Sequence, residues 1–190
     1  MRRTIDELVA AAERHDATRS DRLEKWRVLE PAAGRLLWFL AQTVGALTIV
    51  EVGTSRGAST LWLADAARNT GGRVLSVDLD AAAQAEARRI VAAAGLADQV
   101  SFRTVDGRAA LADVADGSVD LLFLDAERTE YPEWWPHPVR VLRSGGVLVV
   151  DNAVSHADEV APLQALISAD PHLVSTTIGV GKGELVALRR

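Results

Sequence analysis

Cysteine is absent from this chain of 190 residues. Its absence excludes disulfide bonds, thiolate catalysis and cysteine-bound zinc, and it agrees with a reducing, cytoplasmic location. No apolar run approaches the ~18 residues of a membrane span. Two acidic residues, Asp6 and Glu7, precede the first apolar run, so we expect no signal peptide. The formal net charge of −5 argues against a nucleic-acid-binding protein, which usually carries a basic face.

What is present is an alternation of short apolar runs with longer Ala-rich segments, which predicts a single α/β domain over residues 1–190. Runs nearly continuous in Val, Leu, Ile or Phe are typical of parallel strands that are covered on both faces. The alternation also predicts right-handed crossovers and a doubly wound, Rossmann-like sheet. The expected strands are Thr48–Val52, Arg73–Val77, Val100–Val105, Val119–Leu124 and Gly146–Val150. The expected helices are Ala58–Asn69, Ala81–Ala94, Arg108–Val114, Glu133–Leu142 and His156–Ser168.

The two ends of the chain depart from this alternation. Residues 4–45 have an all-helical pattern, with Pro31 at a position where a new helix can begin. Near the C-terminus, a Gly-rich segment at 179–183 separates the β-rich runs Leu173–Ile178 and Glu184–Leu188. Such a pair predicts an antiparallel hairpin. We therefore expect an N-terminal helical extension over residues 1–46 and a mostly parallel sheet, closed by the hairpin, over residues 47–190.

A glycine-containing turn follows the first expected strand, within Glu51-Val52-Gly53-Thr54-Ser55-Arg56-Gly57. Ligands of open α/β sheets bind beyond the carboxyl ends of the strands, and glycines leave room for a ligand at the next helix N-terminus. The spacing is not the dinucleotide pattern G-x-G-x-x-G. For the glycines alone, an ordinary strand-to-helix turn is an equally good interpretation.

Acidic residues follow the second and third strands. Asp78 can accept hydrogen bonds from both ribose hydroxyls of an adenosine, whereas Asp80 suits the N-cap of the next helix. Asp106 can accept from an adenine amine, although formation of an Asp-Gly turn explains it nearly as well. The predicted contacts of an adenosine-containing cofactor are Gly53, Thr54, Gly57, Asp78, Leu79, Asp106, Gly107 and Arg108.

The fourth and fifth strands end in Asp125 and in Asp151-Asn152. If these strands are neighbours, the three side chains converge at one rim of the sheet. Carboxylate and amide oxygens suit Mg²⁺, or alternatively Mn²⁺ or Ca²⁺. Each residue taken alone is also explained by helix capping or by turn formation.

Taken together and in order, these features resemble the catechol/caffeoyl-CoA type of class I O-methyltransferases. The matching pieces are Glu51-x-Gly53-x-x-x-Gly57-x-Ser59-Thr60, Asp78, Phe123-Leu124-Asp125-Ala126 with Tyr131, and Gly145-Gly146-x-x-x-x-Asp151-Asn152, within about residues 20–190. The resemblance implies S-adenosylmethionine as cofactor, with its ribose on Asp78, its methionine moiety near Glu51 and Ser59, and Asp125 beside it. It further implies a divalent cation on Asp125, Asp151 and Asn152, a reversed last strand, and a homodimer.

One position departs from the family pattern. Several members have a lysine three residues after the first metal-binding Asp, where it helps deprotonate the acceptor hydroxyl. Here Arg128 takes that place, and the chain's only lysines are Lys25 and Lys182. Arginine stays protonated, so it cannot be a routine base, but it can stabilise a phenolate. A salt-bridged or solvent-facing Arg128 is an equally good interpretation, and His137 and His156 are further candidate bases.

The resulting hypothesis is methyl transfer to a hydroxyl of a small, catechol-like acceptor bound by the cation, with Asp125 and Arg128 as catalytic residues. Trp26, Tyr131 and Trp134 can line the acceptor pocket, with Trp26 and helices over Arg22–Leu36 as part of a substrate lid. Core packing explains at least one of the tryptophans as well. The alternatives are a metal-independent methyltransferase, a nicotinamide-dependent oxidoreductase and a non-catalytic binding paralogue. The oxidoreductase is weakened by the missing G-x-G-x-x-G and Tyr-x-x-x-Lys patterns. We expect no nucleic-acid or membrane partner.

Overall fold

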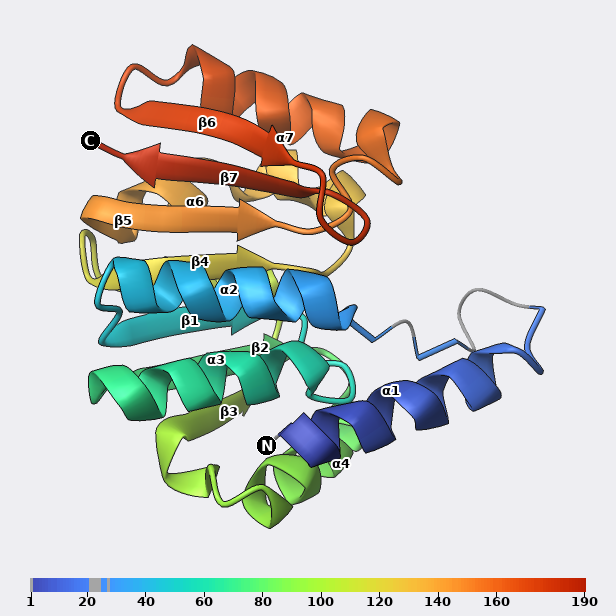
Figure 1. Cartoon of the computed structure of the whole chain (residues 1–190). Coiled ribbons are helices and arrows are strands. Elements are labelled where there is room, and N and C mark those ends of the chain that lie inside the picture. The colour runs from blue at the N-terminus through green and yellow to red at the C-terminus, as the bar shows by residue number, and fades with distance from the viewer. Residues whose placement is uncertain (1, 21–24, 27) are drawn as a thin grey trace.

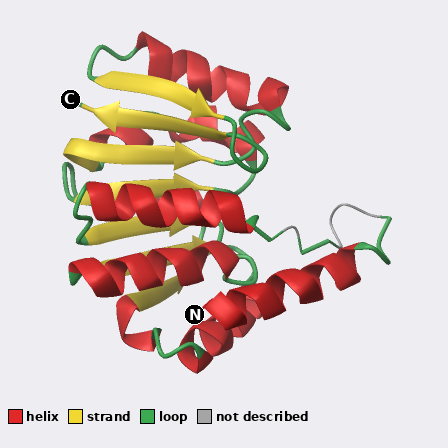
Figure 2. Ribbon diagram, viewed as in Figure 1, coloured by secondary structure: helices red, strands yellow, loops and turns green. Residues whose placement is uncertain are grey.

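The computed structural model describes residues 2–20, 25, 26 and 28–190. Within these residues, seven strands form one sheet with helices on both faces (Figures 1 and 2). None of the helices in these ranges is long and apolar enough to cross a bilayer. The strands are β1 (Thr48–Val52), β2 (Arg73–Asp78), β3 (Val100–Thr104), β4 (Val119–Leu124), β5 (Leu142–Val150), β6 (Leu173–Ile178) and β7 (Glu184–Arg189). The α-helices are α1 (Arg2–Asp16), α2 (Pro31–Thr43), α3 (Ala58–Thr70), α4 (Ala81–Ala93), α5 (Gly107–Asp113), α6 (His137–Arg140) and α7 (Ala157–Ala169), with 3-10 helices η2 (Ala97–Gln99) and η3 (Arg128–Trp134).

The strand order is β3-β2-β1-β4-β5-β7-β6. Strands β1 to β5 run parallel, whereas β7 pairs antiparallel with both β5 and β6. This confirms the predicted fold class, including the reversed C-terminal hairpin. The order changes direction between β1 and β4, and open α/β sheets bind their ligands at such a switch point.

Alternate residues of the central strands face two separate hydrophobic layers. Ile49 of β1 and Phe123 of β4 pack with the layer that includes α2 and α3. Val50 and Leu122, one residue away in each strand, pack with the opposite layer, which includes α5 and α7. Because both faces are covered, these strands are mostly apolar apart from Glu51 and Asp120, and this pattern makes them recognisable in the sequence.

One predicted helix is wrong, and another helical segment is confirmed only in part. A helix over Glu133–Leu142 does not form: η3 ends at Trp134, α6 covers only His137–Arg140, and β5 already begins at Leu142. Prolines at 132, 136 and 138 explain this, because each lacks the N–H that a helix interior requires. The helices expected over Arg22–Leu36 are confirmed only in part: α2 begins at Pro31, as predicted, whereas residues 25, 26 and 28–30 are not helical and residues 22–24 and 27 lie outside the described residues.

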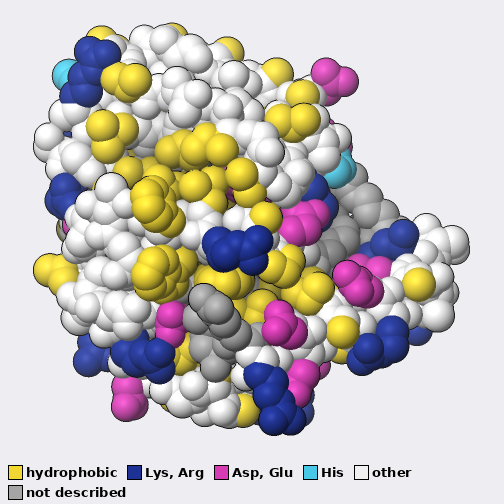
Figure 3. All heavy atoms as spheres, in the orientation of Figure 1, with side chains coloured by type: hydrophobic (Ala, Val, Ile, Leu, Met, Phe, Trp, Pro, Cys, Tyr) yellow, Lys and Arg dark blue, Asp and Glu magenta, His cyan; other side chains and the backbone are white. Residues whose placement is uncertain are grey.

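An apolar surface lies on the α2 side of the C-terminal hairpin. Val174 and Leu188 are paired across β6 and β7 and are exposed, as is Phe39 of α2. Figures 1 and 2 show no helix over this part of the hairpin, and Figure 3 shows hydrophobic side chains gathered there. This face is a candidate contact surface for a further chain.

Asp120 lies near the amino end of β4, where it joins β4 to the α2–β1 connection and to β5. Its Oδ2 accepts from the backbone N–H groups of Leu47 (2.9 Å) and Thr48 (2.7 Å). Its Oδ1 pairs with the Arg143 guanidinium, which also donates to the carbonyl of Val44 at 3.0 Å. A single carboxylate therefore fixes the end of the α2–β1 connection against β4 and β5.

Asp120→Ala is expected to lower the free energy of unfolding by roughly 2–4 kcal/mol, because two backbone donors and a guanidinium lose their buried partner. Urea denaturation measures the change. Asp116→Ala is the matched control, since Asp116 is an exposed partner of Arg140 and its loss should cost less than about 1 kcal/mol. Equal effects of the two substitutions would contradict this assignment.

Candidate functional site

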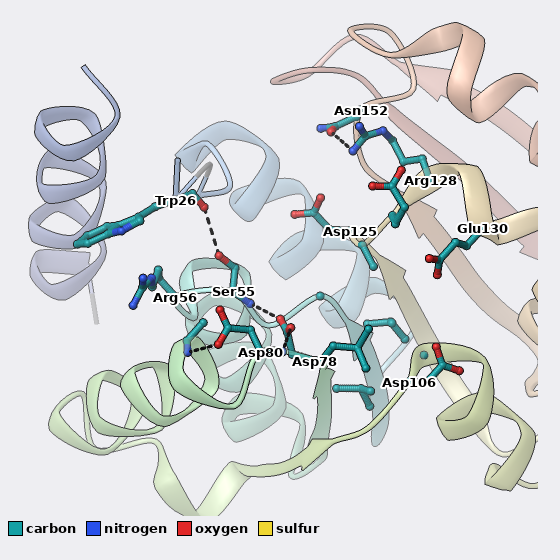
Figure 4. Close-up of a pocket in the computed structure, with 18 of the residues that line it drawn as sticks. Trp26, Ser55, Arg56, Asp78, Asp80, Asp106, Asp125, Arg128, Glu130 and Asn152 are labelled. Atoms are coloured by element: carbon teal, nitrogen blue, oxygen red, sulfur yellow. Dashed lines mark hydrogen bonds between the residues drawn. The ribbon is translucent and has the colours of Figure 1, made fainter. Parts of the chain in front are cut away.

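A cavity of about 780 Å³ opens beyond the carboxyl ends of β1, β2, β4 and β5. Its wall runs from Trp26 and Asp78 at one end to Arg128 and Lys182 at the other, with Gly53 and Asp125 between them. Figure 4 shows the labelled side chains converging from both halves of the sheet. The cavity therefore lies at the switch point, where the topology predicts a ligand.

The turn after β1 forms the centre of the cavity floor. Gly53 has φ +109°, and a Cβ at this position would lie 2.2 Å from the carbonyl oxygen of Asp125. Gly57 has φ +86°, and a Cβ there would lie 2.9 Å from the Cβ of Ala87 in α4. Gly53 lines the cavity and Gly57 does not. Both glycines are thus required by close packing, and only Gly53 also leaves space for a ligand.

Asp78 and Asp80 have different partners, as the sequence predicted. Asp80 caps α4, accepting from the N–H groups of Ala82 (2.9 Å) and Ala83 (3.0 Å). Asp78 accepts from the N–H groups of Ser55 (2.8 Å) and Asp80 (2.9 Å), and it lines the cavity. Ser55 adopts φ +45°, an uncommon conformation for a residue with a side chain. The strained turn after β1 is thus fixed to the end of β2 (Figure 4).

An apolar recess adjoins Asp78. Leu79 lines it and is 69% exposed. Gly107 and Trp134 form the neighbouring wall, and a Cβ on Gly107 would lie 2.7 Å from the Trp134 ring. Asp106 lines the cavity but also caps α5 by accepting from the N–H of Ala109 at 2.9 Å. Trp134 therefore lines the cavity beside the residues expected to hold adenosine, and its predicted contact with the acceptor stays a prediction.

Several predicted contact residues lie behind the cavity wall instead of on it. Tyr131 is fully buried, and its hydroxyl accepts from the N–H of Ala126 at 2.6 Å, so it is not a wall of an acceptor pocket. Glu51, Thr54 and Ser59 are also buried, and Arg108 is exposed outside the cavity. His137, a candidate base, is outside the cavity and accepts from Arg140 at 2.9 Å. The motif residues thus form two groups: residues that line the cavity, and buried residues that hold the lining residues in place.

Glu51 is at the centre of the buried group behind the cavity wall. Its Oε2 accepts from the hydroxyls of Thr60 (2.6 Å) and Ser76 (2.5 Å), which joins β1, β2 and α3. Burial raises the pKa of Glu51 to about 7, although hydrogen bonds from Ser59, Ser76 and Thr60 oppose the change. The carboxyl group therefore ionises near neutral pH in the folded protein.

Trp26 covers the turn from the N-terminal side. The Ser55 hydroxyl donates to the Trp26 carbonyl at 3.2 Å, and the Arg56 guanidinium lies 4.8 Å from the Trp26 ring centroid. His15 of α1 stacks on the same ring with centroids 4.5 Å apart, and Asp16 accepts from the Trp26 N–H at 2.7 Å. Trp26 is thereby attached to the cavity mouth, which agrees with its predicted place in the wall.

Arg128 dominates the other end of the cavity and is only 4% exposed. It donates through Nε to Glu159 at 2.8 Å. Figure 4 shows its second contact, in which Nη1 donates to Asn152 Oδ1 at 3.1 Å. Asp125 and His156 lie on the same part of the wall. Burial and the neighbouring Asp151 raise the pKa of Asp125 well above its usual range, while Lys182 and Arg128 oppose the change. The interpretation of Arg128 as solvent-facing is therefore wrong, and the salt-bridged one is confirmed.

The predicted cation-binding residues come together but do not fit a divalent cation as they are arranged. The Asn152 amide oxygen, one of the three expected ligands, already accepts from Arg128. Asp151 is buried behind the wall, and its Oδ1 accepts from the Asn152 N–H at 2.6 Å. A divalent ion about 4 Å from a guanidinium is repelled by roughly 8 kcal/mol at an effective dielectric constant of about 20. Among the described residues, no group of three His, Asp or Glu side chains is arranged to hold a metal ion.

Comparisons with known proteins agree with this geometry. A family model described as "O-methyltransferase" matches residues 4–189. The chain belongs to the O-methyltransferase family. A Mycobacterium tuberculosis protein named "Putative O-methyltransferase" is 36% identical over 173 residues, covering 84% of this chain and 76% of that protein. The structure of cofactor-bound Rv0187 from MTB is similar at 30% identity and a TM-score of 0.79, with 96% and 89% of the two chains covered. That of the O-methyltransferase TomG from Streptomyces achromogenes, in complex with SAM, is similar at 26% and 0.78, with 98% and 89% covered.

Sequence reasoning missed two residues of this O-methyltransferase at the Arg128 end, Lys182 and Glu184. Both belong to the C-terminal hairpin, for which the sequence pattern predicts a structural role in the sheet and no site residue. Lys182 lines the cavity, and its Nζ lies 3.7 Å from Glu30 Oε1. Glu184 is fully buried, and burial together with the neighbouring Asp151 raises its pKa to about 10. A charged residue in an otherwise β-rich run was the available signal, because such residues are rarely buried without a partner.

Glu51→Gln is expected to change how the stability of this O-methyltransferase depends on pH. The pKa of Glu51 rises from 4.5 to about 7 on folding, so the native state retains its proton longer than the unfolded chain does. Wild-type stability therefore falls, through this group, as the pH rises from about 4.5 to about 8, by on the order of 3 kcal/mol. Glu51→Gln lacks this loss and should gain stability relative to wild type over the same interval.

Urea denaturation at several pH values measures the difference, with the exposed wall residue Glu130 and its Glu130→Gln variant as a matched control. Parallel pH profiles for wild type and Glu51→Gln would contradict the role given to burial.

Proposed function

We propose that this chain transfers a methyl group from S-adenosylmethionine to a hydroxyl of a small acceptor. The observation that carries the proposal is one continuous cavity with two chemically different ends. Asp78, Leu79 and Gly107 form an end with a carboxylate next to an apolar recess, and Asp125 and Arg128 form a charged end. A nucleoside fits the first description, and an ionisable acceptor fits the second.

At the cofactor end, the Asp78 carboxylate would accept from the ribose hydroxyls. Leu79, Gly107 and Trp134 would enclose the adenine, and Asp106 is within the same wall. Glu51, Thr54, Gly57 and Ser59 would act indirectly, by holding the turn that carries Gly53. The cofactor complexes of Rv0187 and of TomG, whose ligand is SAM, support the choice of cofactor.

When bound, S-adenosylmethionine supplies an electrophilic methyl carbon: the acceptor oxygen forms the new C–O bond while the C–S electrons return to sulfur. The protein's task is to align the two partners and to favour the ionised acceptor. Asp125 lies at the junction of the two ends, where it would contact both partners. Arg128 would stabilise the developing oxyanion, and His156 remains a candidate proton acceptor on the wall.

For the acceptor we propose a catechol-like molecule with two adjacent oxygens. The charged wall around Arg128 and Lys182 suits a pair of oxygens better than an apolar group, and the Trp26 ring at the cavity mouth suits an aromatic ring. The exposed apolar face of Phe39, Val174 and Leu188 is where we would place a homodimer contact. A cytoplasmic location and the division into an N-terminal lid over residues 1–46 and a core over 47–190 remain predictions.

Isothermal titration calorimetry is expected to detect binding of S-adenosylmethionine or S-adenosylhomocysteine and none of NAD. Asp78→Ala should weaken S-adenosylhomocysteine binding about 100-fold, since it removes hydrogen bonds to a charged acceptor. Asp98→Ala, at an exposed position outside the cavity, is the matched control and should bind as wild type does. Binding of NAD in preference to S-adenosylmethionine would favour an oxidoreductase, and binding without turnover of any hydroxylated acceptor would favour a non-catalytic paralogue.

A further inference from the structure

The charged end of the cavity contains two protein cations at the position where the family resemblance places a metal ion. Arg128 enters from η3 and is held by Glu159 on one side and by Asn152 on the other. Lys182 enters from the β6–β7 turn. Both charges act on the Asp125 carboxylate, although the two residues are 54 positions apart in sequence.

The backbone conformation of Asn152 accompanies its contact with Arg128. Its backbone has φ +68°, a conformation that Asn tolerates better than most residues with a side chain. Its own N–H bonds to Asp151, and its Oδ1 points to the guanidinium. Its buried Nδ2 has no hydrogen-bond partner among the residues that the structure describes. The Asn152 amide oxygen is therefore occupied by its hydrogen bond with Arg128, although a metal ion would require the same oxygen as a ligand.

Lys182 is held at the rim by the backbone around it. The Lys182 carbonyl accepts from the N–H groups of Val154 (3.1 Å) and Ser155 (2.9 Å), and the Gly183 carbonyl accepts from Ala153 at 2.8 Å. These bonds attach the hairpin turn to the segment that follows Asn152. A Cβ on Gly183 would lie 2.3 Å from the Val154 side chain, so the turn cannot move away from this segment without losing close packing.

We propose that Arg128 and Lys182 together replace the divalent cation, so that methyl transfer in this protein proceeds without a metal. The proposal rests on the proposed function and concerns how the same site stabilises the ionised form of the acceptor hydroxyl. Arg128, whose Nε and Nη2 pair with Glu159 and whose Nη1 donates to Asn152, supplies its positive charge. Lys182 supplies a compact ammonium. Two neighbouring positive charges suit an ionised pair of adjacent oxygens. The acceptor hydroxyl releases its proton to solvent, its oxygen takes the methyl carbon, and the C–S electron pair remains on sulfur.

The first test is Mn²⁺ binding, followed by the electron paramagnetic resonance signal of the free ion. Wild-type protein is expected to leave the signal undiminished at equimolar Mn²⁺. The double variant Arg128→Met/Lys182→Met should reduce the signal, because Asp125, Asp151 and Asn152 become available as oxygen ligands. Arg89→Met, at an exposed position of α4, is the matched control. Stoichiometric Mn²⁺ binding by the wild type that Asp125→Asn abolishes would overturn the proposal, whether or not the double variant folds.

The second test is activity with 3,4-dihydroxybenzoate as a probe catechol. Wild-type turnover should survive EDTA within about twofold, and Lys182→Met should lower kcat about 10- to 100-fold. S-adenosylhomocysteine affinity should stay unchanged in Lys182→Met, which separates this effect from damage to the cofactor end. Loss of turnover in EDTA with recovery in Mg²⁺ would overturn the proposal and leave the proposed function standing. Failure to bind S-adenosylmethionine would instead overturn the proposed function.

Discussion

The contact between the turn after β1 and the end of β4 is the constraint on which the site depends. The Asp125 N–H donates to the Val52 carbonyl at 2.9 Å, and the missing side chain of Gly53 lets the Asp125 carbonyl approach the turn. Because the backbone of this turn contacts the backbone at the end of β4, the two ends of the cavity lie over one continuous floor. Under the proposed function, a nucleoside near Asp78 and an acceptor near Arg128 would lie on opposite sides of the same residue, Asp125.

Around this floor, the protein buries carboxyl groups at a cost in stability. Burial raises the pKa values of Glu51, Asp125 and Glu184 above their ordinary range. Carboxyl groups with such shifted pKa values are often found at functional sites. Buried carboxyl groups and a buried arginine also explain why the side chains at the charged end are tightly connected: each depends on a neighbour for compensation.

Much of the fold was predictable because the pattern that carries it is local. Strands β1 to β4 follow from mostly apolar runs, and the hairpin follows from two β-rich runs joined by a Gly-rich segment. Helix α4 follows from Ala-rich propensity with Asp80 as its cap. The segment before β5 was predicted wrongly because its three prolines, a local signal, interrupt the helical pattern, and because the bulged pairing of β5 with β4 is a tertiary contact. At the site, order along the chain identified Asp78, Leu79 and Asp125. It could not tell that Tyr131 faces inward, that Trp134 lies against Gly107, or that Lys182 returns to Arg128 from the hairpin.

The most direct measurement of this account is a crystal structure grown with S-adenosylhomocysteine and Mn²⁺, with anomalous scattering used to locate the metal. The account predicts the ribose on Asp78, the adenine in the Leu79 recess, the sulfur directed toward Asp125 and Arg128, and no anomalous peak beside Asn152. A ligand bound outside this cavity would contradict the central claim. A manganese ion on Asp125 and Asn152, with Arg128 displaced, would contradict the replacement of the cation by protein side chains.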